Sequence, residues 1–152
     1  MDRTGPLYLD DLEVGQRFRS GVVLVTAESI KAFAAEFDPQ PFHLDESAAV
    51  ASFFGGLVAS GWQTAALTMR LLVESELEIA GGLIGAGVDE MRWPRPVRPG
   101  DTLQAESEVL EVRVSEKRPD RGVVRFKTTT VNQEGQAVME QVARLIVPRR
   151  PA

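Results

Sequence analysis

A carboxylate and the single imidazole of the chain lie five residues apart, at Asp38 and His43. The segment around them, residues 37–45, reads FDPQPFHLD, and its two prolines stiffen the backbone between the two side chains. An imidazole can donate and accept protons near neutral pH, and a neighbouring carboxylate can set its tautomer or act as a second acid or base. The pair could therefore carry acid–base chemistry, although an Asp before Pro is also a common helix terminator and turn former.

A second group of interest opens a long apolar segment, at Ser60, Gly61 and Trp62. Ser60 is suited to cap the N-terminus of a helix, which leaves the amides of Gly61 and Trp62 among the unpaired N–H groups of the first turn. Such amides favour negative charge, and glycine lets a ligand approach the backbone closely. They could form an oxyanion hole for a thioester carbonyl, but a serine cap followed by a packing glycine accounts for the same residues more simply.

A third segment, residues 92–101, reads RWPRPVRPGD and carries three arginines between prolines. Guanidinium groups suit phosphate, so these arginines could lie where a phosphorylated carrier binds. Taken singly, each is better explained by a proline-rich connector that turns at Pro99-Gly100 into a strand. The sequence therefore does not choose one arginine for phosphate binding.

The composition limits the chemistry that these segments can do. The chain has 152 residues, no cysteine and one histidine, which excludes thiolate nucleophiles, disulfides and Cys-based or multi-histidine metal sites within one chain. Its 17 basic and 22 acidic residues give a net charge of -5, which argues against a nucleic-acid-binding face. We find no metal, flavin or nicotinamide motif and expect no cofactor. No apolar run reaches the ~18 residues of a membrane span and no signal peptide is evident, so we expect a cytoplasmic protein without a membrane partner.

The first half of the chain is predicted to be mostly helical. A polar lead-in covers residues 1–16, and a Val-rich strand covers 17–25. A helix capped by Thr26 then runs to the first proline of the stiff segment, and a short helix capped by Asp45 runs through Phe54. The apolar face of the first helix is formed by Ile30, Phe33, Ala34 and Phe37.

The second half is organised around one long helix and a set of strands. Residues 61–75 have few polar positions on any side, and a helix that is apolar nearly all round is usually buried. Strands follow from Ile84, and the one over 101–114 changes its alternation at Val109-Leu110, which indicates a β-bulge. The last two strands of an antiparallel meander are expected over residues 123–132 and 136–147.

These elements predict a single α+β domain over residues 1–152, with its core at about 15–148. In this arrangement a curved antiparallel sheet wraps the long helix. One sheet covers only part of such a helix and leaves edge strands unpaired. A homodimer that joins two sheets edge to edge would solve both problems, so we expect at least a dimer.

Taken together, the three segments resemble the MaoC-like family of hotdog-fold dehydratases and (R)-specific enoyl-CoA hydratases. The family motif D-x-N-P-x-H is matched by Asp38, Pro41 and His43, and the glycine that opens the family's buried helix is matched by Gly61. The family's later element, aromatic-x-x-P-V-x-P-G-D, is matched by Trp93, Pro96, Val97, Pro99, Gly100 and Asp101. Order and spacing agree over about residues 15–148.

The resemblance implies a hotdog fold, a dimeric assembly and a specific chemistry. Asp38 and His43 would be the acid–base pair that activates a water for addition to a 2-enoyl thioester, or that runs the reverse dehydration. The amide of Gly61 would hold the enolate-like oxygen, and Gln40, Ser60 and Trp62 would contribute to substrate binding. The acyl group would be carried by CoA or by a carrier protein, with CoA entering only as part of the substrate.

Two residues depart from the family pattern. Gln40 stands where the family has Asn and is one methylene longer, so its geometry toward the water or His43 changes. Ser60 stands where the family often has His, which keeps the amide of Gly61 but removes a second imidazole. Two alternatives therefore stay open: a hotdog acyl-CoA thioesterase in which Asp38 directs water to the carbonyl carbon, and a catalytically inactive homologue that only binds acyl thioesters.

Overall fold

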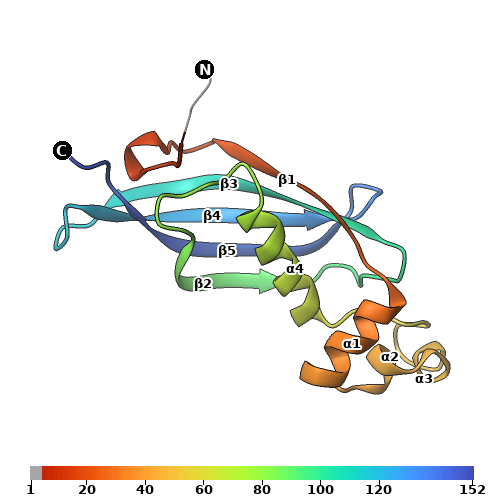
Figure 1. Cartoon of the computed structure of the whole chain (residues 1–152). Helices are drawn as coiled ribbons and strands as arrows, with labels where there is room; N and C mark the ends of the chain where they lie inside the picture. The colour runs from red at the N-terminus through yellow and green to blue at the C-terminus, as the bar shows by residue number, and fades with distance from the viewer. Residues whose placement is uncertain (1–4) are drawn as a thin grey trace.

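The computed structural model of the chain describes residues 5–152, so the first four residues of the expected domain and lead-in lie outside the described residues. A five-stranded antiparallel sheet, ordered β1-β3-β4-β5-β2, curves around the long helix α4 (Figure 1). Its strands are β1 (Arg17–Leu24), β2 (Ile84–Arg92), β3 (Thr102–Val114), β4 (Arg121–Val131) and β5 (Ala137–Pro148). The helices are α1 (Ala27–Phe37), α2 (Pro41–Leu44), α3 (Glu46–Val50) and α4 (Gly61–Val73), after a short 3-10 helix at Leu9–Asp11. The expected α+β class is confirmed.

The long strands alternate between buried and solvent-facing side chains, as a sheet with one covered face requires. In β3 the buried positions are every second residue from Leu103 to Val109, and the pairing with β4 then shifts register between Val109 and Glu111. This shift is the β-bulge that the change of alternation predicts. The expected meander of β3, β4 and β5 is present as consecutive antiparallel neighbours.

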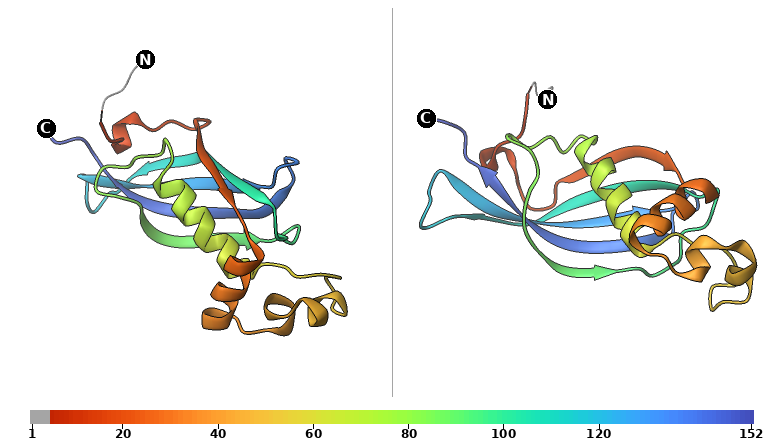
Figure 2. Two further views of the ribbon diagram at one scale, coloured as in Figure 1. Left: turned by 45° about the vertical axis from the view of Figure 1, so that its right-hand side comes forward. Right: turned by 60° about the horizontal axis from the view of Figure 1, so that its bottom comes forward.

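Helix α4 crosses the covered face of the sheet, while α1, α2 and α3 gather at one end of the molecule (Figure 2). As expected, the sheet of the single chain covers only part of α4. Its sheet-facing side is buried, and there Thr68 Oγ1 shares a hydrogen bond of 2.7 Å with Thr130 Oγ1. Because one sheet covers only one side, the opposite side exposes an apolar stripe, which we define as Trp62, Ala66, Met69 and Val73.

Three further expectations for the first half need correction. The lead-in is not merely polar, because Leu7, Leu9 and Leu12 belong to the hydrophobic core and Leu7 forms a bridge with Ile79. The helix capped by Asp45 stops at Val50 rather than Phe54. The prolines do end α1, but Pro41 also begins α2, since the ring of proline fits the first turn of a helix, where its missing N–H costs nothing.

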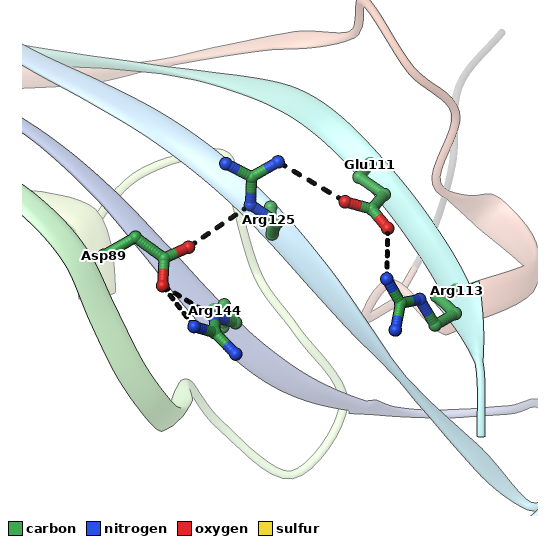
Figure 3. Close-up of polar contacts among 5 residues, drawn as sticks. All are labelled: Asp89, Glu111, Arg113, Arg125 and Arg144. Atoms are coloured by element: carbon green, nitrogen blue, oxygen red, sulfur yellow. Dashed lines mark hydrogen bonds and ion pairs between the residues drawn. The ribbon is translucent and has the colours of Figure 1, made fainter.

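The outer face of the sheet carries a cluster of charged side chains that we call the outer-face cluster: Asp89, Glu111, Arg113, Arg125 and Arg144 (Figure 3). Arg125 bridges the two carboxylates, at 3.3 Å from an oxygen of each. Arg144 pairs with Asp89, and Arg113 lies 3.0 Å from Glu111. Hydrogen bonds from Arg144 and Arg125 lower the pKa of Asp89 below its ordinary value. The cluster therefore satisfies its own charges across four strands.

Candidate active site

A pocket of about 570 Å³ lies where the three segments singled out in the sequence meet. Backbone hydrogen bonds hold these segments together: the Val58 amide donates to the Phe42 carbonyl at 3.3 Å, and the Ala59 amide donates to the Val97 carbonyl at 2.9 Å. The wall is mostly apolar and includes five Phe or Trp side chains. The lining residues used below are Asp38, His43, Phe53, Phe54, Gly61, Trp62, Trp93, Arg95 and Arg98.

The most buried ionisable groups of this pocket are Asp38 and His43. Asp38 is the residue that caps the C-terminus of α1, and His43 lies in the single turn of α2, which begins at Pro41. The chain reverses between the two helices, which brings Asp38 Oδ2 to 3.3 Å from His43 Nε2. Their side chains are 17% and 6% exposed, so the pair is shielded yet faces the pocket.

The tautomer of His43 follows from its other ring nitrogen. Nδ1 lies 2.7 Å from the carbonyl oxygen of Val58, and a carbonyl oxygen can only accept. Nδ1 therefore carries a proton, and in the neutral ring Nε2 presents a lone pair. In that state Nε2 and the carboxylate of Asp38 are two acceptors that face each other.

Two side chains hold the carboxylate of Asp38. Ser60 Oγ donates to its Oδ2 at 2.7 Å, and Gln40 Nε2 donates to its Oδ1 at 2.6 Å. Burial raises the pKa of Asp38, but these hydrogen bonds and the neighbouring His43 outweigh it, so the pKa lies below its ordinary value of 3.8. Asp38 is therefore ionised at neutral pH. Ser60 and Gln40 contact this carboxylate and lie outside the pocket wall, so their part in substrate binding stays a prediction.

The N-terminus of α4 supplies one free amide to the pocket. Ser60 caps the helix as expected, but its Oγ accepts from the Trp62 amide at 3.2 Å, so the prediction that this amide is unpaired is wrong. Among the described residues, no group accepts from the amide of Gly61. The helix dipole and this open N–H together favour negative charge at Gly61.

Gly61 is also fixed by its contact with Trp93, which begins the proline-rich connector. Trp93 Nε1 donates to the Gly61 carbonyl at 3.0 Å, and the ring lies so close that a Cβ built at Gly61 would be 2.7 Å from it. The Trp62 ring meets Trp93 edge-on, with centroids 5.4 Å apart, and both line the pocket. Only a glycine lets the indole of Trp93 form this wall.

The structure thus brings four of the six predicted site residues to the pocket: Asp38, His43, Gly61 and Trp62. Sequence reasoning missed the Val58 carbonyl that orients His43, because a backbone acceptor leaves no side-chain signature. It also missed the roles of Phe53 and Phe54 as wall residues. For Trp93, the available signal is an aromatic residue at the start of a proline-rich segment.

The whole fold has a close counterpart among solved structures. The MaoC-like dehydratase from Rhodospirillum rubrum matches with a TM-score of 0.93 and 57% sequence identity, over 96% of this chain and 99% of that chain. The sheet wrapped around α4 is therefore the hotdog fold, in the form shared by hydratases and dehydratases. A family model described as a MaoC like domain matches residues 12–132, and the chain belongs to the MaoC-like family.

Two relatives agree with this placement over most of their length. The uncharacterized protein YdeM of Bacillus subtilis is 33% identical over 143 residues, which are 94% of this chain and 100% of that protein. The 3-hydroxyacyl-thioester dehydratase Z of Mycobacterium tuberculosis is 34% identical over 139 residues, which are 89% of this chain and 87% of that protein. Among the described residues, no helix is both long enough and apolar enough to cross a membrane.

Proposed function

We propose that the protein adds water to a 2-enoyl thioester, or removes it from a 3-hydroxyacyl thioester, with the acyl group carried by CoA. The observation that carries this proposal is the 3.3 Å approach of Asp38 Oδ2 to His43 Nε2 in the pocket that also holds the open amide of Gly61. The name of the M. tuberculosis relative, a 3-hydroxyacyl-thioester dehydratase, supports the thioester class.

The two facing acceptors suit a water molecule as their shared donor. A water can donate one O–H to the lone pair of His43 Nε2 and the other to the carboxylate of Asp38. Its oxygen then has its lone pairs directed away from the pair and toward the pocket. The low pKa of Asp38 makes it a poor proton acceptor, so His43 is the better base for this water.

The proposed reaction balances within these groups. The water oxygen bonds to C3 of the enoyl group as one of its protons passes to His43, and the electron pair of the double bond moves to the thioester oxygen. The Gly61 amide stabilises the enolate-like oxygen that forms. His43 then returns a proton to C2, and the carboxylate of Asp38 stabilises the intermediate imidazolium. Only water and protons are exchanged, so we propose that no cofactor is needed.

The test follows the conjugated thioester absorbance of short 2-enoyl-CoA substrates. We expect wild type to consume this absorbance and to form the 3-hydroxyacyl thioester, and we expect Asp38→Asn and His43→Gln each to lower kcat by about 10²–10⁴-fold. Full rates in both variants would overturn the assigned roles. Release of free thiol would instead indicate a thioesterase, and thermal stabilisation by acyl-CoA without turnover would indicate an inactive binding homologue.

We also propose that two chains form a homodimer over the apolar stripe of α4. Trp62, Met69 and Val73 are 60%, 47% and 61% exposed, and the edge strand β2 lies open along nearly its whole length. A contiguous apolar stripe beside an unpaired strand is costly to leave in water. Light scattering after size exclusion should give twice the chain mass, and a monomeric mass at micromolar concentration would overturn this assembly.

A further inference from the structure

Two arginines of the proline-rich connector, Arg95 and Arg98, line the same pocket as Asp38 and His43. We propose that Arg95 binds the phosphate at the outer end of a pantetheine thioester arm and that Arg98 holds the pocket wall. This assignment rests on the proposed function, because it takes the ligand to be an acyl thioester. The assignment gives different roles to Arg95 and Arg98, which the sequence alone does not distinguish.

Arg95 has the free hydrogen-bonding capacity that an anion site needs. Its side chain is exposed at the pocket and, within the described part of the chain, forms no hydrogen bond or ion pair. Every other described arginine side chain except that of Arg118 donates a hydrogen bond or pairs with a carboxylate, and Arg118 lies in the turn between β3 and β4, outside the pocket. Among the arginines of the pocket, Arg95 alone can thus give all its donors to a ligand.

The backbone around Arg95 is stiff. Pro94 precedes it and Pro96 follows it, and each proline fixes its own φ while restricting the residue before it to extended conformations. Little backbone freedom remains to be lost when a ligand binds. The connector can therefore present this guanidinium at one place on the rim.

The position of Arg95 relative to the buried pair selects the end of the substrate that it meets. Asp38 and His43 are largely buried, whereas Arg95 is exposed. A thioester whose reacting carbons lie at the pair must extend its carrier end outward through the open part of the pocket. That end carries phosphate in CoA and in the phosphopantetheine of a carrier protein, and guanidinium recognises phosphate with paired N–H donors.

Arg98 is already engaged with protein. Its Nη2 donates to the Phe54 carbonyl at 2.8 Å, and its Nη1 would lie 3.2 Å from a Cβ built at Gly56. Since Phe53 and Phe54 line the pocket, Arg98 fixes this part of the wall. Part of the Arg98 guanidinium is thus already bound to the wall, whereas all the donors of Arg95 are open, so we assign Arg98 a positioning role.

The outer-face cluster is a weaker candidate for the same ligand, although it holds three arginines. Its guanidinium groups are paired with Asp89 and Glu111 (Figure 3), which an incoming anion would have to displace and would be repelled by. None of its residues lines the pocket with Asp38 and His43. Free donors, rather than the number of arginines, favour Arg95.

The experiment compares Arg95→Gln with Arg98→Gln and with the matched control Arg118→Gln, which removes an equally unpaired charge outside the pocket. Each variant is assayed with one 2-enoyl group on four carriers: CoA, a phosphopantetheinyl carrier protein, phosphopantetheine, and pantetheine without phosphate. If wild type turns over none of the four, the proposed function fails and the phosphate assignment fails with it. If wild type turns over the pantetheine thioester, which has no phosphate, then catalysis and phosphate binding can be tested separately.

We expect Arg95→Gln to raise KM about tenfold for the phosphate-bearing substrates and less than about twofold for the pantetheine thioester, with kcat nearly unchanged. A rise of KM for CoA, phosphopantetheine and the carrier protein alike supports the proposal, because these substrates share that phosphate. A rise for CoA alone would point to its nucleotide phosphates and would overturn the proposal. Arg98→Gln should change all four substrates equally, and Arg118→Gln none. An equal change of KM on pantetheine and CoA in Arg95→Gln would overturn the proposal.

Discussion

The pocket and the outer-face cluster place their polar groups in opposite ways. The cluster holds three arginines and two carboxylates on β2, β3, β4 and β5, and each arginine is paired with at least one carboxylate. The pocket holds fewer charged side chains, but three of its hydrogen-bonding groups are open to a ligand: the lone pair of His43 Nε2, the amide of Gly61 and the guanidinium of Arg95. Open hydrogen-bonding groups, more than the number of charges, therefore mark the place where a ligand can bind.

The pKa of a carboxylate is lowered both in the cluster and in the pocket, but the causes and the consequences differ. Arginines lower the pKa of Asp89 in the cluster, where the result is an ion pair that leaves nothing over for a ligand. At Asp38, burial acts in the opposite direction and neutral donors, Ser60 and Gln40, hold the carboxylate ionised. Neutral donors stabilise the charge without cancelling it, so Asp38 can still orient a water and stabilise an imidazolium.

The largest effect on the shape of the pocket is expected from Gly61→Ala. The added Cβ would lie 2.7 Å from the Trp93 ring, so the ring or the start of α4 must move. We expect a loss of about 1–3 kcal/mol in the free energy of unfolding and a fall in kcat/KM of at least about tenfold, because the open amide shifts. Chemical denaturation and steady-state kinetics measure the two effects.

The matched control is Gly21→Ala, because a Cβ at Gly21 in β1 meets no atom within 4 Å. A second variant tests the cause: in a Trp93→Ala background, Gly61→Ala should cost clearly less stability than it does in wild type. If Gly61→Ala leaves both stability and kcat/KM at the wild-type level, the close approach of Trp93 does not shape the site.

An intermediate effect is expected from Ser60→Ala, which removes one donor from the carboxylate of Asp38. We expect kcat/KM to fall about tenfold at neutral pH, the usual scale for a hydrogen bond to a charged group. The pKa of Asp38 should rise, because one of the hydrogen bonds that stabilise its charged form is lost. A pH titration of the Asp38 carboxyl carbon by NMR measures this change, and an unchanged pKa of Asp38 would contradict the role given to Ser60.

Ser60 also caps α4, so a loss of stability alone would not be informative. Thr26→Ala is the control, since Thr26 caps α1 by accepting from the Ser29 amide outside the pocket. Both variants should lose about 1 kcal/mol of stability, and only Ser60→Ala should raise the pKa of Asp38 and lower kcat/KM. The sign for stability follows from the lowered pKa of Asp38: its contribution is present above the unfolded pKa and is lost as the pH falls through the folded pKa.

Local signals in the sequence predicted much of the fold because their causes are local. The caps at Thr26 and Asp45 and the β-bulge after Val109 depend on a few neighbouring residues, and all three are confirmed. The prediction of a polar lead-in is wrong because the burial of Leu7 and Leu9 depends on β4, β5 and residues 77–79, which lie far away in the chain.

In the candidate site, too, the features that depend on neighbouring residues could be predicted, and those that depend on distant segments could not. The spacing of Asp38 and His43 on a stiff loop is local, and the structure brings them together. The Val58 carbonyl, the Trp93 wall and the division of labour between Arg95 and Arg98 depend on contacts between distant segments, which one sequence does not reveal. The catalytic and binding roles of the six site residues remain predictions, and the variants above test four of them: Asp38, His43, Ser60 and Gly61.

The smallest effect on activity is expected from Asp89→Asn. This substitution tests whether pairing with carboxylates is what keeps the arginines of the outer-face cluster from binding an anion. The substitution removes the carboxylate that pairs with Arg125 and Arg144 and so leaves free guanidinium donors on the outer face. Because these side chains are exposed, we expect only a slight fall in the thermal midpoint and unchanged kcat and KM. The same substitution should create weak, salt-sensitive binding of inorganic phosphate that wild type and the control Arg113→Gln lack, measured by calorimetry at low ionic strength. If charge compensation were not what keeps anions from the cluster, Asp89→Asn would bind phosphate no better than wild type, and the contrast with Arg95 would lose its physical basis.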